Sequence, residues 1–222
     1  QSEMLGEMHV NFQKLRIKIL INGIKTEIKM GRESILNSIK QHKPALELIP
    51  EIDLNLFSED INLLETFKNN VQLVGGNIKD LEHHNDFDSV IKELYPNAER
   101  IIADGSASNL GTVSITKKTD PHTLENVDLA IIKGAFGIAE NGSVWILEDQ
   151  FPIRILPFIT NDLVIILSKK DLCLHMHDAY KIIADRERTF GLFISGPSKT
   201  ADIEQCLVIG AQGAMSLTIL LV

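Results

Sequence analysis

A polar turn near the C-terminal end of the sequence carries the residue types best suited to binding an anion. Residues 190–194 are apolar and predict a buried strand, residues 195–200 predict a turn, and residues 201–209 predict a short helix. Ser198 or Thr200 can cap that helix by accepting hydrogen bonds from its first main-chain N–H groups. Because the same helix end carries a positive dipole, we expect a phosphate or carboxylate site at this turn.

The charged residues around the turn support this site only in part. Lys199 places a mobile cation beside the turn. Asp202 and Glu204 oppose it, because acidic residues in the first turn of a helix already satisfy the dipole and repel an anion. These residues alone fit a well-capped helix without a ligand equally well.

A second candidate lies in the turn at residues 138–143. Asn141 and Gly142 are a strong turn signal, which places Glu140 at the shoulder of the turn. A carboxylate there can act as a base, as a nucleophile or as a hydrogen-bond acceptor. A solvated turn residue without a chemical role is the alternative.

Arg154 and a group of histidines complete the candidates. A guanidinium can bind a carboxylate or phosphate through two hydrogen bonds, although a structural ion pair explains Arg154 equally well. His175, His177 and Asp178 suggest a metal site. On a helix, however, a spacing of two directs His175 and His177 to different sides, so we expect a structural role for them.

These candidates lie among alternating helices and apolar strands. Helical spacing of apolar residues predicts helices at 33–41, 58–69, 87–94 and 171–184. Apolar runs predict strands at 71–74, 100–103, 129–133, 143–147, 163–167, 190–194 and 216–222. Parallel strands need crossover connections, so the alternation predicts an α/β domain with a mainly parallel sheet and helices on its faces.

Composition limits the class of protein. The 222 residues suffice for one domain with a sizeable core, and the net charge of -8 argues against a general nucleic-acid binder. Cys173 and Cys206 are far apart, so we expect neither a disulfide framework nor a zinc or iron–sulfur site. No apolar stretch is long enough to span a bilayer and no signal peptide is evident, which predicts a cytoplasmic protein.

The first 29 residues differ from the remainder. Apolar residues alternate with polar ones over residues 15–21, and Asn22 and Gly23 follow, which favours a β-hairpin. We expect residues 1–29 to be an extension, introduced by cloning or by a misplaced start codon, and residues 30–222 to be the domain itself. The alternative is a native hairpin that adds strands or assists association.

Three segments resemble the LUD domain family, typified by lactate utilization protein C. They are GPSKTADIE at residues 196–204 with LVIG at 207–210, GIAENGS at 137–143, and RILP at 154–157. A weaker similarity of layout reaches back to about residue 30. With the resemblance added, we assign a catalytic role to Glu140. Substrate-binding roles are assigned to Gly137, Asn141, Ser143, Arg154, Gly196, Ser198, Lys199, Thr200 and Asp202.

The sequence departs from the family pattern at several positions. Asn141 stands where relatives usually have Thr, and Thr160 stands where many have His, so roles of those hydroxyl and imidazole groups do not carry over. Gln212 and Ala214 replace the common His and Pro. The resemblance still implies a three-layer αβα fold, like that of ribose-5-phosphate isomerase, glucosamine-6-phosphate isomerase and coenzyme A transferases. A shared fold does not transfer their reactions.

The resemblance implies a role in lactate utilization. We expect a component that binds no cofactor itself and acts with iron–sulfur subunits in the oxidation of L-lactate to pyruvate. A small organic acid or a phosphate-bearing molecule is the expected ligand. Two alternatives remain: a stand-alone isomerase or acyl transferase that uses Glu140, and an anion-binding module without catalysis.

Overall fold

The computed structural model describes residues 31–48, 50–51, 53, 56, 60–81, 86–150, 153–185, 190–200 and 207–222. The chain divides into two compact units, residues 1–53 and residues 54–222. The described part of the first unit contains a helix over residues 31–41, as predicted for 33–41. The hairpin predicted within residues 1–29, and Asp202, lie outside the described residues.

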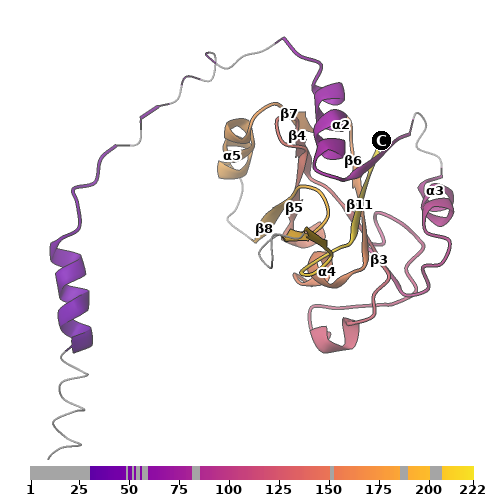
Figure 1. Cartoon of the computed structure of the whole chain (residues 1–222), viewed down its shortest axis with the longest axis horizontal. Coiled ribbons are helices and arrows are strands. Elements are labelled where there is room, and N and C mark those ends of the chain that lie inside the picture. Colours follow the sequence, from indigo (N-terminus) through magenta and orange to yellow (C-terminus); the bar gives the residue numbers. More distant parts are fainter. Residues whose placement is uncertain are drawn as a thin grey trace, which may run out of the picture. The chain divides into compact units, whose positions relative to one another are not determined.

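The second unit is built on a five-stranded, all-parallel sheet with the order β1-β11-β6-β3-β2 (Figure 1). Its strands are β1 (Asn77–Asp80), β2 (Ile101–Ala103), β3 (Leu129–Lys133), β6 (Asp162–Leu167) and β11 (Ser216–Leu221). The three central strands are almost entirely buried, as expected for parallel strands covered on both faces. The predicted mainly parallel sheet is therefore confirmed.

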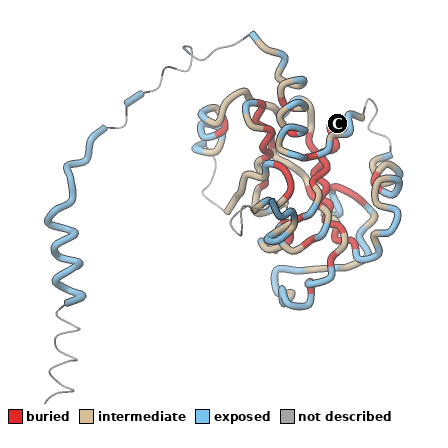
Figure 2. Tube along the Cα trace, in the orientation of Figure 1, coloured by how far each residue is buried: buried red, intermediate tan, exposed pale blue. Residues whose placement is uncertain are grey.

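Helices cover both faces of this sheet, which confirms the three-layer αβα architecture. On one face, α2 (Leu63–Leu73) packs through Phe67 and Val71. On the other, α3 (Phe87–Leu94) packs through Ile91. Because side chains alternate along a strand, Ile165 faces α2 while Val164 and Ile166 face α3. Figure 2 shows the buried residues concentrated on the sheet strands.

A smaller sheet shares the layer of α2. It has the order β7-β4-β5-β8, with β4 (Phe136–Ile138), β5 (Ser143–Leu147), β7 (Leu172–Cys173) and β8 (Gly191–Ile194). The short α4 (Leu156–Ile159) precedes β6, and α5 (Met176–Ala184) packs on the outer face of this sheet. Two-residue strands β9 (Lys199–Thr200) and β10 (Val208–Ile209) pair separately. The second unit also contains the 3-10 helices η2 (Pro121–Leu124) and η3 (Glu148–Gln150).

Three predicted elements are wrong in detail. Val71 lies in the last turns of α2, fully buried at helical spacing from Phe67, and not in a strand at 71–74. The helix predicted from Asp171 begins at Met176, after strand β7. The helix predicted to reach residue 209 does not do so, because Val208–Ile209 form β10 and pair with β9.

Asp80 at the end of β1 makes the fold sensitive to acid. The Lys169 ammonium, and then that of Lys68, hold the pKa of Asp80 below its ordinary value. A lowered folded-state pKa stabilises the fold above about pH 4, and this stabilisation is lost as the pH falls through the folded-state pKa. We expect Asp80→Asn to lower the unfolding free energy by about 1 kcal/mol at pH 7. Urea unfolding at pH 7 and at about pH 2.5 checks this, since the difference from the unsubstituted protein must shrink at the lower pH.

Candidate functional site

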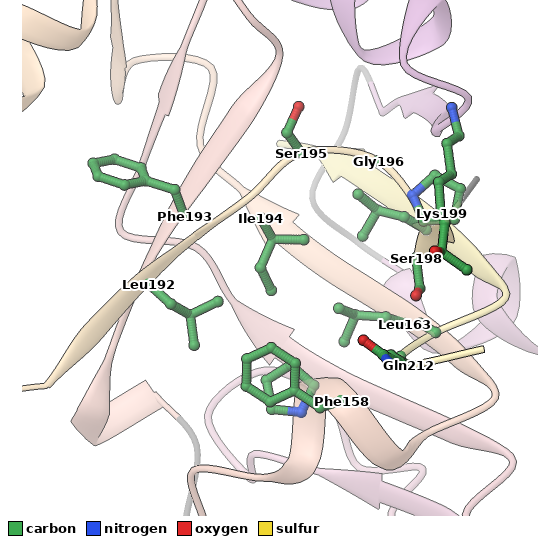
Figure 3. A pocket seen from close by; sticks show the side chains of 16 residues that line it. Phe158, Leu163, Leu192, Phe193, Ile194, Ser195, Gly196, Ser198, Lys199 and Gln212 are labelled. Atoms are coloured by element: carbon green, nitrogen blue, oxygen red, sulfur yellow. The ribbon is translucent and has the colours of Figure 1, made fainter. Parts of the chain in front are cut away.

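The candidate site is a cleft of about 350 Å³ beside the polar turn at residues 195–200 (Figure 3). Its walls are β8, this turn, α4 and the loop at 212–214. Leu163 and Leu192 lie on the apolar side, while Ser198 and Gln212 supply polar groups. Apolar walls with a few polar groups are typical of small-molecule sites.

Gly196 and Ser198 fix the turn against two other parts of the fold. Gly196 has a φ of 74°, and a Cβ on it would lie 2.5 Å from the Val74 carbonyl oxygen at the end of α2. The Ser198 N–H donates to the Ala214 carbonyl at 2.8 Å, and the Ser198 carbonyl accepts from the Gly210 N–H at 3.0 Å. These contacts hold the main chain of the turn, and the Ser198 hydroxyl lines the cleft.

Lys199 is directed to α2. Its Nζ donates to the carbonyl of Val74, the C-cap residue of α2, and Figure 3 shows the side chain extending away from Ser198 and Gln212. Helix α2 has no basic residue in its own last turn, so Lys199 supplies the positive charge that stabilises a helix C-terminus. The ammonium therefore has a structural role that its position in the sequence did not reveal.

We expect Lys199→Met to lower the unfolding free energy by about 0.5–1 kcal/mol, because the C-terminus of α2 loses its cation and one carbonyl partner. Urea unfolding followed by the fluorescence of Trp145, the single tryptophan, measures this. Lys118→Met, at another exposed lysine, is the matched control and should change stability by less than about 0.5 kcal/mol. Equal losses in both variants would contradict a specific capping role.

The Glu140 carboxylate is hydrogen-bonded to the first residues of α5. Its Oε2 lies 2.7 Å from Nδ1 of His175, and its Oε1 accepts the Met176 N–H at 2.9 Å. The Asp178 side chain accepts from the His175 N–H at 3.2 Å. His175 and Asp178 thus order the first turn of the helix, in agreement with the structural role expected for them. Within the described ranges, no three His, Cys, Asp or Glu side chains gather as a metal site.

Asn141 and Ser143 organise the β4–β5 turn. Asn141 Oδ1 accepts from the main-chain N–H of Ser143 at 3.0 Å and from its hydroxyl at 2.7 Å. The Asn141 carbonyl accepts from the Ser195 hydroxyl at 3.0 Å, which connects this turn to the turn beside the cleft. Gly137 lies on β4, where a Cβ would be 2.8 Å from the Phe67 ring. These three residues pack and connect elements.

Arg154 forms an ion pair outside the cleft. Its Nε and Nη2 donate to Glu148 Oε1 at 2.9 and 2.7 Å, and its guanidinium lies 4.7 Å from the centre of the Phe190 ring. The hydrogen bond from Arg154 lowers the pKa of the Glu148 carboxyl. Arg154 lines a separate pocket of about 410 Å³, together with Lys117 and Thr119 among others.

The structure thus brings four of the predicted residues to the cleft and places five others away from it, while Asp202 lies outside the described residues. Those at the cleft are Gly196, Ser198, Lys199 and Thr200, whereas the residues lining it do not include Gly137, Glu140, Asn141, Ser143 or Arg154. Phe158 and Leu192 line the cleft although their local sequence gives no signal for it. Gln212 also lines the cleft, and its departure from the family pattern is the signal that the sequence offers.

Comparison with known proteins shows the family of this chain. The family model described as "LUD domain" matches residues 14–222. The chain belongs to the LUD domain family. The boundary expected at residue 30 stays a prediction.

Relatives of this LUD domain include bacterial proteins named lactate utilization protein C. The one from Bacillus pumilus is 25% identical over 135 residues, which cover 58% of this chain and 56% of the relative. Lactate utilization protein C 1 from Bacillus mycoides is 28% identical over 155 residues, covering 60% and 66%. The chain therefore spans roughly half to two thirds of the curated relatives it matches.

A solved structure supports the fold of the LUD domain. The crystal structure of a DUF162 family protein from Deinococcus radiodurans aligns with a TM-score of 0.53 over 72% of this chain and 95% of that one. Its sequence identity is 14%, so the similarity concerns the fold. Among the described helices, none is both long and apolar enough to cross a membrane.

Proposed function

We propose that this LUD domain works in lactate utilization, as a cytoplasmic component that acts with iron–sulfur subunits in the oxidation of L-lactate to pyruvate. The observation that carries the proposal is its membership in the LUD family, together with relatives named lactate utilization protein C. In this proposal the chain binds no cofactor, and the iron–sulfur clusters belong to its partners.

The chemistry of the cleft fits a small hydroxy acid. The Ser198 hydroxyl and the Gln212 amide supply hydrogen-bonding groups to one side of the cleft, where a carboxylate can accept and a substrate hydroxyl can donate. Leu163 and Leu192 offer an apolar surface to a methyl group. The main chain of the polar turn is held on both sides, by Val74 and by Ala214, so Ser198 is already in place before a ligand binds.

The geometry does not favour a stand-alone isomerase or acyl transferase. Such an enzyme needs Glu140 and the turn at 195–200 on one pocket. The Glu140 carboxylate is occupied with His175 and the Met176 N–H, and the residues that line the cleft do not include it. An anion-binding module without catalysis fits the cleft, but has no observation in its favour beyond those that support the lactate role.

Deletion of the gene in its own host tests the proposal. We expect the deletion strain to lose growth on L-lactate as sole carbon source while keeping growth on glucose, and the full chain to restore it. Normal growth of the deletion strain on L-lactate would overturn the proposed function.

Ligand binding to the purified chain tests the site. Titration with L-lactate, followed by Trp145 fluorescence, should give saturation that Ser198→Ala weakens and Glu140→Gln leaves nearly unchanged. Inorganic phosphate in the same assay distinguishes a hydroxy acid site from a general anion site. Tighter binding of phosphate than of lactate would count against the assignment of the cleft.

A further inference from the structure

Strand β8 lies at the edge of the smaller sheet, directly beside the cleft. Among the described strands, in the order β7-β4-β5-β8, it pairs only with β5, in an antiparallel register that sets Gly191 opposite Leu147 and Phe193 opposite Trp145. Main-chain groups on an edge strand that point away from the sheet are a ready template for another strand.

The register shows which groups of β8 point outward. The Trp145 carbonyl accepts from the Ala135 N–H at 2.8 Å, and the Leu147 N–H donates to the Gln150 side chain at 2.8 Å. Both groups therefore face away from β8. In an antiparallel ladder, two opposite residues either exchange main-chain hydrogen bonds with each other or both point their N–H and C=O groups away from the partner strand.

Gly191 and Phe193, which stand opposite Leu147 and Trp145, consequently direct their N–H and C=O groups to the outer edge. In the part of the chain that the structure describes, these groups have no hydrogen-bond partner. Residues 191–194 also lack the charges and prolines that usually protect an edge. The N–H and C=O groups of Gly191 and Phe193 are two residues apart, which is the spacing at which an extended peptide can form main-chain hydrogen bonds with them.

The cleft has room for more than lactate. Lactate has six non-hydrogen atoms, and even at the volume of one water per atom it fills about 180 Å³ of a cleft of about 350 Å³. Residues of α4 and β8 give one side of the cleft an apolar surface, and Phe158 there has 49% of its surface exposed. Side chains of a strand added to β8 that point to the same face as Leu192 and Ile194 enter this space.

Charge selects the kind of peptide. The Lys199 ammonium follows the end of β8 and contacts the Val74 carbonyl. No carboxylate of the described residues lies within ion-pair distance of it. A peptide with an apolar centre and an acidic residue at the Lys199 end therefore complements this edge.

We propose that the open edge of β8, next to the cleft, receives an extended acidic–apolar segment of a partner subunit, which adds a strand to the smaller sheet and covers the cleft. The identity of the partner as an iron–sulfur subunit rests on the proposed function. The added strand pairs with Gly191 and Phe193, and one of its apolar side chains packs against Phe158.

Hydrogen–deuterium exchange tests this inference on the full chain, alone and mixed with the purified iron–sulfur subunits of the same host. We expect exchange at residues 190–195 to slow at least about tenfold on mixing. Phe158→Asp should weaken the complex at least about tenfold, because it places a charge at the centre of the contact. Ile182→Asp is the matched control, since Ile182 is an exposed apolar residue on α5, and should leave the affinity unchanged.

The outcomes separate this inference from the proposed function. Slowed exchange at 190–195 with a specific effect of Phe158→Asp supports it. A complex without slowed exchange there, no complex at all, or slowed exchange that arises from self-association of the chain overturns it. Loss of growth on L-lactate in the deletion strain leaves the role in lactate utilization standing in each of those three cases, whereas normal growth removes it.

Discussion

Gly142→Ala is expected to lower the unfolding free energy by about 3 kcal/mol or more, the largest effect of any single substitution considered. Gly142 has a φ of 64°, a conformation that costs an L-residue about 1–2 kcal/mol. A Cβ there would also lie 2.6 Å from the Val71 main-chain N and 2.8 Å from the Asn70 main-chain carbon. Because those atoms belong to helix α2, no side-chain rotation relieves the clash, and the β4–β5 turn must move away from the helix.

Urea unfolding followed by Trp145 fluorescence measures this effect, since Trp145 lies on β5 next to the turn. Gly105→Ala is the control, because nothing lies within 4 Å of a Cβ at that position. It should change the unfolding free energy by less than about 0.5 kcal/mol. A loss below about 1 kcal/mol for Gly142→Ala would mean that the turn does not pack on α2 as described.

The central strands of the five-stranded sheet were predictable because they are buried on both faces. The runs at 129–133 and 163–167 are apolar without alternation, which is the pattern of parallel strands, and β3 and β6 have these positions with one residue of difference at most. The strand predicted at 71–74 was wrong for a related reason. A short apolar run does not distinguish a strand from the buried side of a helix. Val71 belongs to helix α2, which buries it in the core together with Phe67.

In the smaller sheet, the sequence predicted strands β5 and β8 but not β4 or β7. Gly134 and Gly137 favour a turn in this segment, but β4 begins at Phe136. At Gly137 the absent side chain leaves space for Phe67 and Leu172, so this glycine marks a close approach inside a strand. Glycine is common in turns for conformational reasons and in strands for packing reasons, and only the partner element tells the two apart.

The sequence predicted the polar turn beside the cleft but not the apolar residues that form its walls. Ser198 was found from its local pattern, whereas Phe158 and Leu192 reach the cleft only because α4 and β8 are brought together by the fold. Lys199 was predicted as a partner for an anion, yet its ammonium contacts Val74, which is 125 residues away. Contacts over such separations leave no trace in local spacing, so the chemistry of a residue type was predictable but its partner was not.

Glu140→Ala is expected to lower the unfolding free energy by about 2 kcal/mol, because two charge-assisted hydrogen bonds at the start of α5 are lost together. Glu140→Gln should cost less, since its side-chain oxygen can still accept from the Met176 N–H. Glu93→Ala, at an exposed glutamate of α3, is the control and should change stability by less than about 0.5 kcal/mol. Urea unfolding of the three variants measures these values.

The same variants separate a structural carboxylate from a catalytic one. If Glu140 acts only through α5, strains carrying Glu140→Gln at a temperature where the protein stays folded will grow on L-lactate at nearly the normal rate. A catalytic carboxylate predicts the opposite result, because the amide keeps the shape of the side chain but can neither take up a proton nor act as a nucleophile. Loss of growth with Glu140→Gln, in a protein whose unfolding free energy has fallen by less than about 1 kcal/mol, would therefore show that Glu140 takes part in the chemistry and that the cleft is not the whole site.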